Sequence, residues 1–322
     1  MNTALLPRNR LLAARVRSLS KLTLQTDRFV FFRLALGLMV LYKYLSIGPY
    51  WNAFFSESGL LSPEILALNN NPGLFSWHLW CDQLSLITGW TSADISSGFY
   101  SLTICAGVAF TIGLFSRLSA VLLLLVNASL TATFSEYSYG VDHFLTSLLA
   151  YAVLFPLGRP FSADHLLWAF GRRIQWVFFK GIPGEWAMAA LRIHLCIVYF
   201  IGGLTKLGGP TWWNGEAVWK AMNRPGNEMA FLLADAMPMR ELYIMLGIST
   251  ILVELLYPAL IWWRRSRTMW LWLTLGMHLF IGIILELHLF ATCMIVFNLL
   301  AFGQFASKSS SPDILHQQTR SS

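Results

Sequence analysis

The chain has 322 residues, of which 56% are hydrophobic and only 12% are charged. Its mean hydropathy is +0.56, whereas a soluble domain usually has about 25% charged residues. This composition excludes an ordinary soluble protein and predicts an all-α integral membrane protein. The net charge of +7 does not indicate nucleic-acid binding, because the basic residues lie between apolar runs, where they orient a chain in a membrane. We therefore expect the lipid bilayer as a partner and no nucleic acid.

Eight apolar runs approach the length of about 20 residues that a membrane-spanning helix needs. In chain order they are Phe29–Ile47, Ser97–Leu114, Ala120–Tyr137, Phe144–Leu157, Trp186–Leu204, Leu242–Trp263, Thr268–Leu287 and Leu289–Phe305. The fourth run is short. The last two are nearly continuous and predict either a tight hairpin around Glu286 and His288 or one span plus a re-entrant piece. We predict about eight transmembrane helices.

Charge bias predicts how these helices are oriented. Six basic residues precede the first span, and the loop from 48 to 96 contains no Lys or Arg. Cytoplasmic loops are enriched in Lys and Arg, so the N-terminus and the C-terminus should both be cytoplasmic. The loop after the fifth span is an exception. It has four basic residues, Lys206, Lys220, Arg224 and Arg240, yet alternation of the spans places it outside. Because this loop departs from the charge rule, we expect it to contain functional residues.

The chain divides by composition into three parts. Residues 1–28 are rich in Arg and Lys and predict a basic segment at the membrane interface. Residues 29–305 contain the apolar runs and form the predicted membrane domain. Residues 306–322 are polar and predict a disordered tail.

The segment Ile197–Trp219 is the most informative part of the chain. An apolar run leads directly into Lys206, and Trp212, Trp213 and Glu216 follow two Gly and a Pro. A lysine at this position either extends its ammonium into the headgroups or is partly withdrawn from water. In the second case its proton affinity falls, and it can serve as a base.

Three histidines are further candidates. His143 opens the fourth span on the same predicted side as Lys206, directly after Asp142, which can cap the helix. His278 lies about 16 Å into the seventh span, near the bilayer centre. It is either a neutral imidazole bonded to a neighbouring helix or a group that handles protons. His194 lies about three turns before Lys206 on roughly the same helix face.

The remaining polar groups do not match a familiar catalytic motif. There is no Gly-rich phosphate loop, no HExxH and no GxSxG. The histidines are too scattered for a metal site, so we expect no metal. Glu254, four residues before Pro258, is an acid inside a span. It could neutralise a buried cation or polarise an imidazole.

Five stretches carry a resemblance to a known family. They are the first apolar run leading into YWNAFFSESGLLSP, then VDHFLTSLLAYAVLFPLGRPFSADHLL, IVYFIGGLTKLGGPTWWNGEAV, ELLYPALIW followed by a basic turn, and MHLFIGIILELHLFATCMIVFNLLAFG. Their order resembles the HTTM family, the membrane module shared by vitamin K-dependent γ-glutamyl carboxylases and many bacterial proteins. SdpB-like bacteriocin-maturation proteins are members too. The resemblance covers roughly Arg28 to Gly303, and the third stretch is the most specific.

The resemblance implies roles for three residues. In the carboxylases the lysine of the third stretch is regarded as the base that deprotonates vitamin K hydroquinone, which implies this role for Lys206. The histidines that match the family pattern are His143 and His278. In that family the oxygenated quinol anion becomes a strong base that takes a proton from a glutamyl γ-carbon, and CO2 adds to the carbanion. The implied cofactors are a quinol or vitamin K-like reductant, O2 and CO2.

Two departures restrict the implied substrate. Thr205 stands where the carboxylases have the first residue of a basic pair. The sequence also ends where the carboxylases continue into a large lumenal domain that grips the substrate. We therefore do not expect a long protein substrate. A small lipid-soluble reductant, a short secreted peptide or an operon-encoded partner remains open.

Two functional hypotheses follow. The leading one is an enzyme or peptide-maturation factor of the bacterial inner membrane, with carboxylase-like (lyase) chemistry or a quinone-linked modification of a peptide. The alternative is a non-enzymatic transporter, or a scaffold or immunity protein for a secreted peptide. The candidate catalytic residues, in an external-facing cavity, are Lys206, His143 and His278. The candidate substrate-binding residues are Tyr199, Trp212, Trp213, Glu216 and His194.

Overall fold

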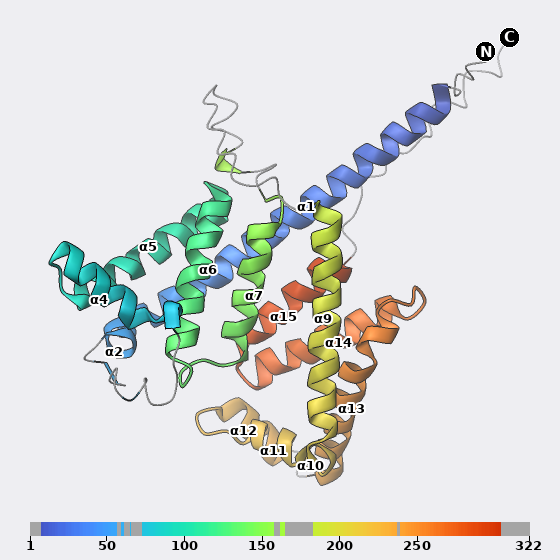
Figure 1. The fold of residues 1–322 in the computed structure, drawn as a ribbon. Coiled ribbons are helices and arrows are strands. Elements are labelled where there is room, and N and C mark those ends of the chain that lie inside the picture. The colour runs from blue at the N-terminus through green and yellow to red at the C-terminus, as the bar shows by residue number, and fades with distance from the viewer. Residues whose placement is uncertain are drawn as a thin grey trace.

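The computed structural model describes residues 8–56, 59–60, 65, 73–157, 162–164, 183–236 and 239–303. For residues 8–27 it describes the backbone alone. Every element in these ranges is a helix (Figure 1), which confirms the predicted all-α class. The predicted tail, residues 306–322, lies outside the described ranges.

The helices follow one another with short connections. The first half of the chain contains α1 (Arg8–Ile47), the 3₁₀ helix η1 (Gly48–Tyr50), α2 (Trp51–Phe55), η2 (Gly73–Phe75), α4 (Trp77–Thr88), α5 (Ser92–Ile112), α6 (Ser116–Thr133) and α7 (Gly140–Leu154). The second half contains α9 (Gly184–Leu207), α10 (Pro210–Trp213), α11 (Glu216–Met222), α12 (Glu228–Ala236), α13 (Arg240–Leu260), α14 (Arg267–Ile284) and α15 (His288–Phe302).

Six helical segments in the described part of the chain are long and apolar enough to cross a membrane. They are Arg28–Phe55, Ser92–Ile112, Ser116–Thr133, Gly184–Leu207, Arg240–Leu260 and Arg267–Ile284. The two other predicted spans are apolar helices of 15 residues, α7 and α15. A full crossing by α7 and α15 stays a prediction. The predicted basic segment is continuous with the first span, because α1 already begins at Arg8.

The last two apolar helices form the tight hairpin that was one of the two predicted arrangements. Only residues 285–287 separate α14 from α15. Glu286 has a φ of 55°, which is uncommon for a residue other than Gly. Gly282 of α14 packs so closely on α15 that an added Cβ would lie 2.8 Å from the Cβ of Ala291. The glycine therefore permits the close approach of the two helices.

Hydrogen bonds bring together helix ends that the charge pattern predicts to be cytoplasmic. Arg28 donates from Nη2 to the carbonyl oxygen of Gly303, at 2.8 Å, and Arg33 donates from Nη1 to that of Leu157, at 3.2 Å. Carbonyls at helix C-termini lack partners within the helix, so these arginines satisfy them. The short helices α2 and α10–α12 lie at the opposite end of the bundle (Figure 1).

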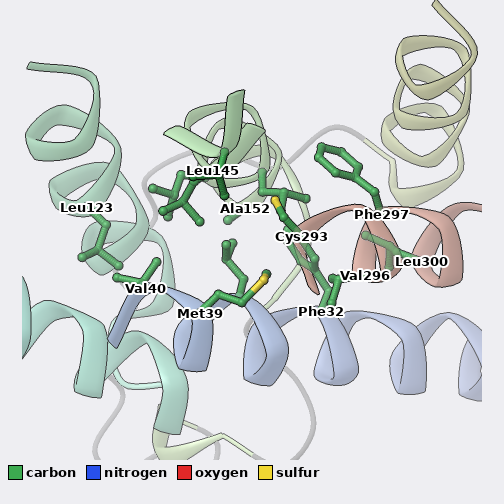
Figure 2. Packing of buried hydrophobic residues seen from close by; sticks show 14 of the residues in the cluster. Phe32, Met39, Val40, Leu123, Leu145, Ala152, Cys293, Val296, Phe297 and Leu300 are labelled. Atoms are coloured by element: carbon green, nitrogen blue, oxygen red, sulfur yellow. The ribbon is translucent and has the colours of Figure 1, made fainter. Parts of the chain in front are cut away.

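The core forms where α6, α7 and α15 pack around the middle of α1. Figure 2 shows Met39 and Val40 of α1 beside Leu123 of α6 and Leu145 of α7, with Cys293 of α15 nearby. All five side chains are almost completely buried. Packing of apolar side chains thus holds the first span between the two halves of the bundle.

Candidate functional site

The backbones of α9 and α13 approach each other closely just before Lys206. A Cβ added to Gly203 would lie 2.8 Å from the backbone nitrogen of Leu255. Small residues allow such approach between membrane helices. On α13, Pro258 lies inside the helix and has no N–H to donate to the carbonyl of Glu254. Gly202 and Gly203 therefore allow the C-terminal end of α9 to lie against the turn of α13 that contains Glu254.

This approach pairs Lys206 with Glu254. The Lys206 Nζ lies 2.6 Å from the Glu254 Oε2, and the side chains are 22% and 11% exposed. The ammonium also lies 5.2 Å from the centre of the Trp212 ring, within the range of a cation–π contact. From the sequence, Glu254 could neutralise a buried cation or polarise an imidazole. The contact with Lys206 matches the first interpretation. Lys206 is thus paired with a carboxyl group rather than lying alone among apolar side chains.

A hydrogen-bonded network lies deeper in the bundle. Asn298 donates from Nδ2 to the carbonyl oxygen of Met294 at 2.8 Å and to the Tyr199 hydroxyl at 2.7 Å. Tyr257 donates to the Asn298 Oδ1 at 2.7 Å. The Tyr199 hydroxyl lies 2.7 Å from the His278 Nε2. Because the Met294 carbonyl can only accept, the amide orientation is fixed, and the Tyr199 proton is directed to His278.

This arrangement puts the proton of a neutral His278 on Nδ1. That atom is buried and has no hydrogen-bond partner within the described residues. An unpaired buried polar group costs about 1–3 kcal/mol and is unusual in a folded protein. Tyr199 lies about two turns before Lys206 on α9, and Tyr257 lies about one turn after Glu254 on α13. The ion pair and the network therefore form one candidate site.

His143 lies apart from this site. Its side chain is exposed at the start of α7, and none of the described contacts joins it to Lys206 or His278. The next residue, Phe144, packs against Phe290 with ring centres 5.8 Å apart, and Phe290 packs against His278 at the same separation.

His194 lies in another part of the bundle. Its ring packs against Tyr151, at 5.8 Å, and Phe297, at 6.4 Å. Twelve residues separate it from Lys206, a distance of about 18 Å along a helix. The structure does not bring His194 to the candidate site. In the part of the chain that the structure describes, no group of three or more His, Cys, Asp or Glu side chains is placed to hold a metal ion.

Two predicted substrate contacts face the surface. Trp213 is exposed and donates from Nε1 to the carbonyl oxygen of Leu207 at 2.8 Å. Glu216 pairs with Lys220 at 2.6 Å, one helical turn away. Hydrogen bonding from Lys220 lowers the pKa of the Glu216 carboxyl, so this acid stays ionised as a surface group. Of the two tryptophans, Trp212 is the one that contacts Lys206.

Sequence reasoning missed a second buried ion pair. The Lys43 Nζ lies 2.6 Å from the Asp142 Oδ1 and 2.8 Å from the Asn127 Oδ1. Tyr44 also donates to the Asn127 Oδ1, at 2.9 Å. The other carboxylate oxygen of Asp142 accepts from the backbone nitrogen of Tyr139. Asp142 thus caps the helix from its third position, with Tyr139 as the N-cap residue, and not from the position directly before the helix that the sequence predicted. The sequence did contain a signal for this pair, because Lys43 is an ionisable residue inside the first predicted span.

Comparison with known proteins identifies the family. The model of the HTTM domain matches residues 83–304, about two thirds of the chain. This range includes the ion pair of Lys206 with Glu254 and the whole His278 network, whereas Lys43 lies before it. No curated protein and no solved structure matches the chain. The chain is therefore a multi-pass membrane protein that belongs to the HTTM domain family, a family associated with vitamin K-dependent carboxylase-like membrane proteins.

Proposed function

We propose that the protein is an enzyme of the bacterial inner membrane in which the Lys206–Glu254 pair accepts a proton from a lipid-soluble substrate. The observation that carries the proposal is the 2.6 Å contact between Lys206 and Glu254, partly withdrawn from water at the end of a membrane helix. Membership of the HTTM family supports carboxylase-like chemistry for such a site. Ionisable groups inside membrane spans are costly and usually functional.

The pair, rather than the lysine alone, is the proton acceptor. Lys206 and Glu254 share one proton whether the resting state is an ammonium with a carboxylate or an amine with a carboxylic acid. Either form can take up one more proton and become a pair with a single positive charge. That charge stabilises the substrate anion left behind, and it does so strongly where the dielectric constant is low. The Trp212 ring, 5.2 Å from the ammonium, adds a cation–π contact that favours the positive charge.

The residues beside the pair fit a quinol-like molecule. The buried His278 Nδ1 provides a donor that has no acceptor among the described residues, and a hydroxyl or carbonyl oxygen is the partner that it requires. Tyr199 holds this ring in one orientation through the 2.7 Å contact at Nε2. When bound, a quinol with O2 supplies the strong base that glutamyl carboxylation with CO2 requires. His143 and His194 are left out of the proposal because their contacts lie elsewhere.

Reconstitution of the purified protein in lipid nanodiscs tests this function. The assay supplies vitamin K hydroquinone, oxygen, radiolabelled bicarbonate and a short glutamyl peptide, and follows hydroquinone consumption and label in the peptide. We expect the rate of hydroquinone consumption to be roughly a hundredfold lower in Lys206→Met and in Glu254→Gln than in the wild type. Loss of a general acid or base has an effect of this size. Lys220→Met removes the surface pair and serves as the matched control.

The two readouts separate the possible substrates. Consumption with label in the peptide supports carboxylation. Consumption without label supports another quinone-linked modification of a secreted peptide or an operon-encoded partner. A wild-type protein that consumes no hydroquinone under these conditions contradicts the proposal and favours the transporter or scaffold hypothesis.

A further inference from the structure

One cavity of the described structure lies away from the Lys206–Glu254 pair. Its volume is about 320 Å³, and it is bounded by the ends of α1 and α6, by α2, by the start of α7 and by the turn between α14 and α15. We call it the α1–α6 cavity. Small-molecule sites usually measure about 300–1,000 Å³, so it suits a ring-sized molecule or a short chain segment. The residues used in the argument below are Lys43, Phe54, Thr131, Phe134, Tyr137 and Asp142.

The buried pair of Lys43 and Asp142 forms the charged wall of this cavity. Each side chain is 10% exposed. The Lys43 ammonium donates hydrogen bonds to Asp142 and Asn127 and lies 5.2 Å from the centre of the Tyr44 ring, and an ammonium carries three hydrogens. One N–H therefore remains for a further acceptor. Because Asp142 neutralises Lys43 and Glu286 adds a second carboxylate to the wall, an anionic ligand would meet net negative charge.

Two hydroxyl groups of the lining residues also lack acceptors. Thr131 Oγ1 and Tyr137 Oη are buried, and neither has a hydrogen-bond partner within the residues that the structure describes. Burial, reinforced by the nearby Glu136, raises the pKa of the Tyr137 hydroxyl, so this group keeps its proton. Buried polar groups normally find partners. The lining thus offers three donors, from Thr131, Tyr137 and Lys43, each with a hydrogen that has no acceptor among the described residues.

The other walls are aromatic. The rings of Phe54 and Tyr137 meet edge to face at 5.1 Å, and those of Phe134 and Tyr137 are stacked at 6.1 Å. Phe55 packs against Phe134 at 5.0 Å. Rings in these arrangements favour a flat or compact apolar body. The aromatic walls and the unpartnered donors of the cavity together favour an apolar ligand with one uncharged oxygen acceptor.

We propose that the α1–α6 cavity binds a small uncharged molecule with a carbonyl oxygen on an aromatic or compact apolar body. The carbonyl oxygen accepts hydrogen bonds from the Tyr137 and Thr131 hydroxyls beside the Lys43 ammonium, and the rings of Phe54 and Phe134 hold the body. This site is independent of the proposed proton transfer, because neither Lys206 nor Glu254 lines it.

Benzophenone and diphenylmethane form a matched pair of probes, because they share two phenyl rings and differ in the carbonyl. The full-length protein in one detergent is titrated with each probe, and the midpoint of thermal unfolding is followed. A ligand that binds the folded state raises this midpoint. We expect benzophenone to raise it and diphenylmethane to raise it less than half as much. Irradiation should crosslink benzophenone to the peptide containing residues 130–142, because its carbonyl is also the photoreactive group.

Two variants test the hydroxyls without changing the volume of the cavity. Tyr137→Phe and Thr131→Val each remove an unpartnered buried hydroxyl, so the midpoint without probe should stay equal or rise. The benzophenone-induced rise should fall by at least half in each variant and stay unchanged in Tyr50→Phe, a tyrosine exposed outside the cavity. Equal responses to the two probes, an undiminished response in both variants, or crosslinks outside the cavity would each overturn the proposal.

Discussion

Gly203 of α9 lies against the backbone of Leu255 on α13, and this contact brings Lys206 to 2.6 Å from Glu254. The proximity of the two charged groups therefore depends on a glycine that has no charge. In membranes, where apolar burial gives little drive for helix association, close backbone packing supplies much of the attraction. The functional pair and the packing of the helix pair are thus linked.

The first prediction concerns this helix crossing. Gly203→Ala places a Cβ against the backbone of α13, which cannot move away as a side chain can, so the helices should separate. We expect a loss of about 1–3 kcal/mol in stability, as for an overpacked core, together with a strong loss of activity. In Gly202→Ala the added Cβ meets the flexible end of the Glu254 side chain at 3.1 Å, so the loss should be smaller. Thermal unfolding of the two variants in one detergent compares them.

The second prediction separates the structural and chemical roles of the ion pair. Glu254→Leu leaves the Lys206 charge without its partner, which should cost about 1–3 kcal/mol after allowance for partial exposure. The double variant Lys206→Met with Glu254→Leu removes both charges and should recover most of that stability. A double-mutant cycle of unfolding free energies measures the coupling. A double variant no more stable than Glu254→Leu would show that the charges are not coupled.

The third prediction concerns the tautomer of His278. Asn298→Leu removes the amide that directs the Tyr199 proton toward His278, and it leaves the Tyr257 hydroxyl without its acceptor. We expect a cost of about 1–3 kcal/mol and a mixture of His278 tautomers, measured by nitrogen NMR of labelled histidine. Tyr257→Phe keeps the amide in place and should retain the single tautomer. Retention of that tautomer in Asn298→Leu would contradict the assignment.

The fourth prediction concerns the turn between α14 and α15. Glu286 has a φ of 55°, a conformation that costs a non-Gly residue about 1 kcal/mol or more. Glu286→Gly relieves this strain, and the exposed side chain makes no described hydrogen bond that would be lost. We expect the variant to be as stable as the wild type or up to about 1 kcal/mol more stable. A clear loss of stability in thermal unfolding would show that the carboxylate has a structural role.

Much of the fold was predictable because hydropathy reports directly on membrane helices. Each predicted span has an apolar helix in the structure, and α7 and α15 are the short ones. Lys206 stood out because it breaks the charge rule, and Glu254 because it is an acid inside a span. Lys43 carries the same signal as Glu254, but the hydropathy of the first span does not single it out, so the second ion pair was not predicted.

The grouping of the site residues was less predictable, because it depends on which helix faces meet. His143 and Lys206 share a predicted side of the membrane, yet α7 directs Asp142 inward and leaves His143 exposed. The bond between Tyr257 and Asn298 joins residues 41 positions apart, and no local pattern links them. Their roles follow from the packing of α13 and α15 near α9, which periodicity along a single helix does not reveal.

The most direct test of the central claim is the rate of vitamin K hydroquinone consumption by the double variant Lys206→Met with Glu254→Leu. The double variant must first be shown to unfold at the same temperature as the wild-type protein. Lys220→Met is measured in parallel. If the pair accepts the proton, the double variant is stable but consumes hydroquinone roughly a hundredfold more slowly than the wild type, whereas Lys220→Met is unchanged. A stable double variant with the wild-type rate would contradict the account, because the pair would then serve only to join α9 to α13.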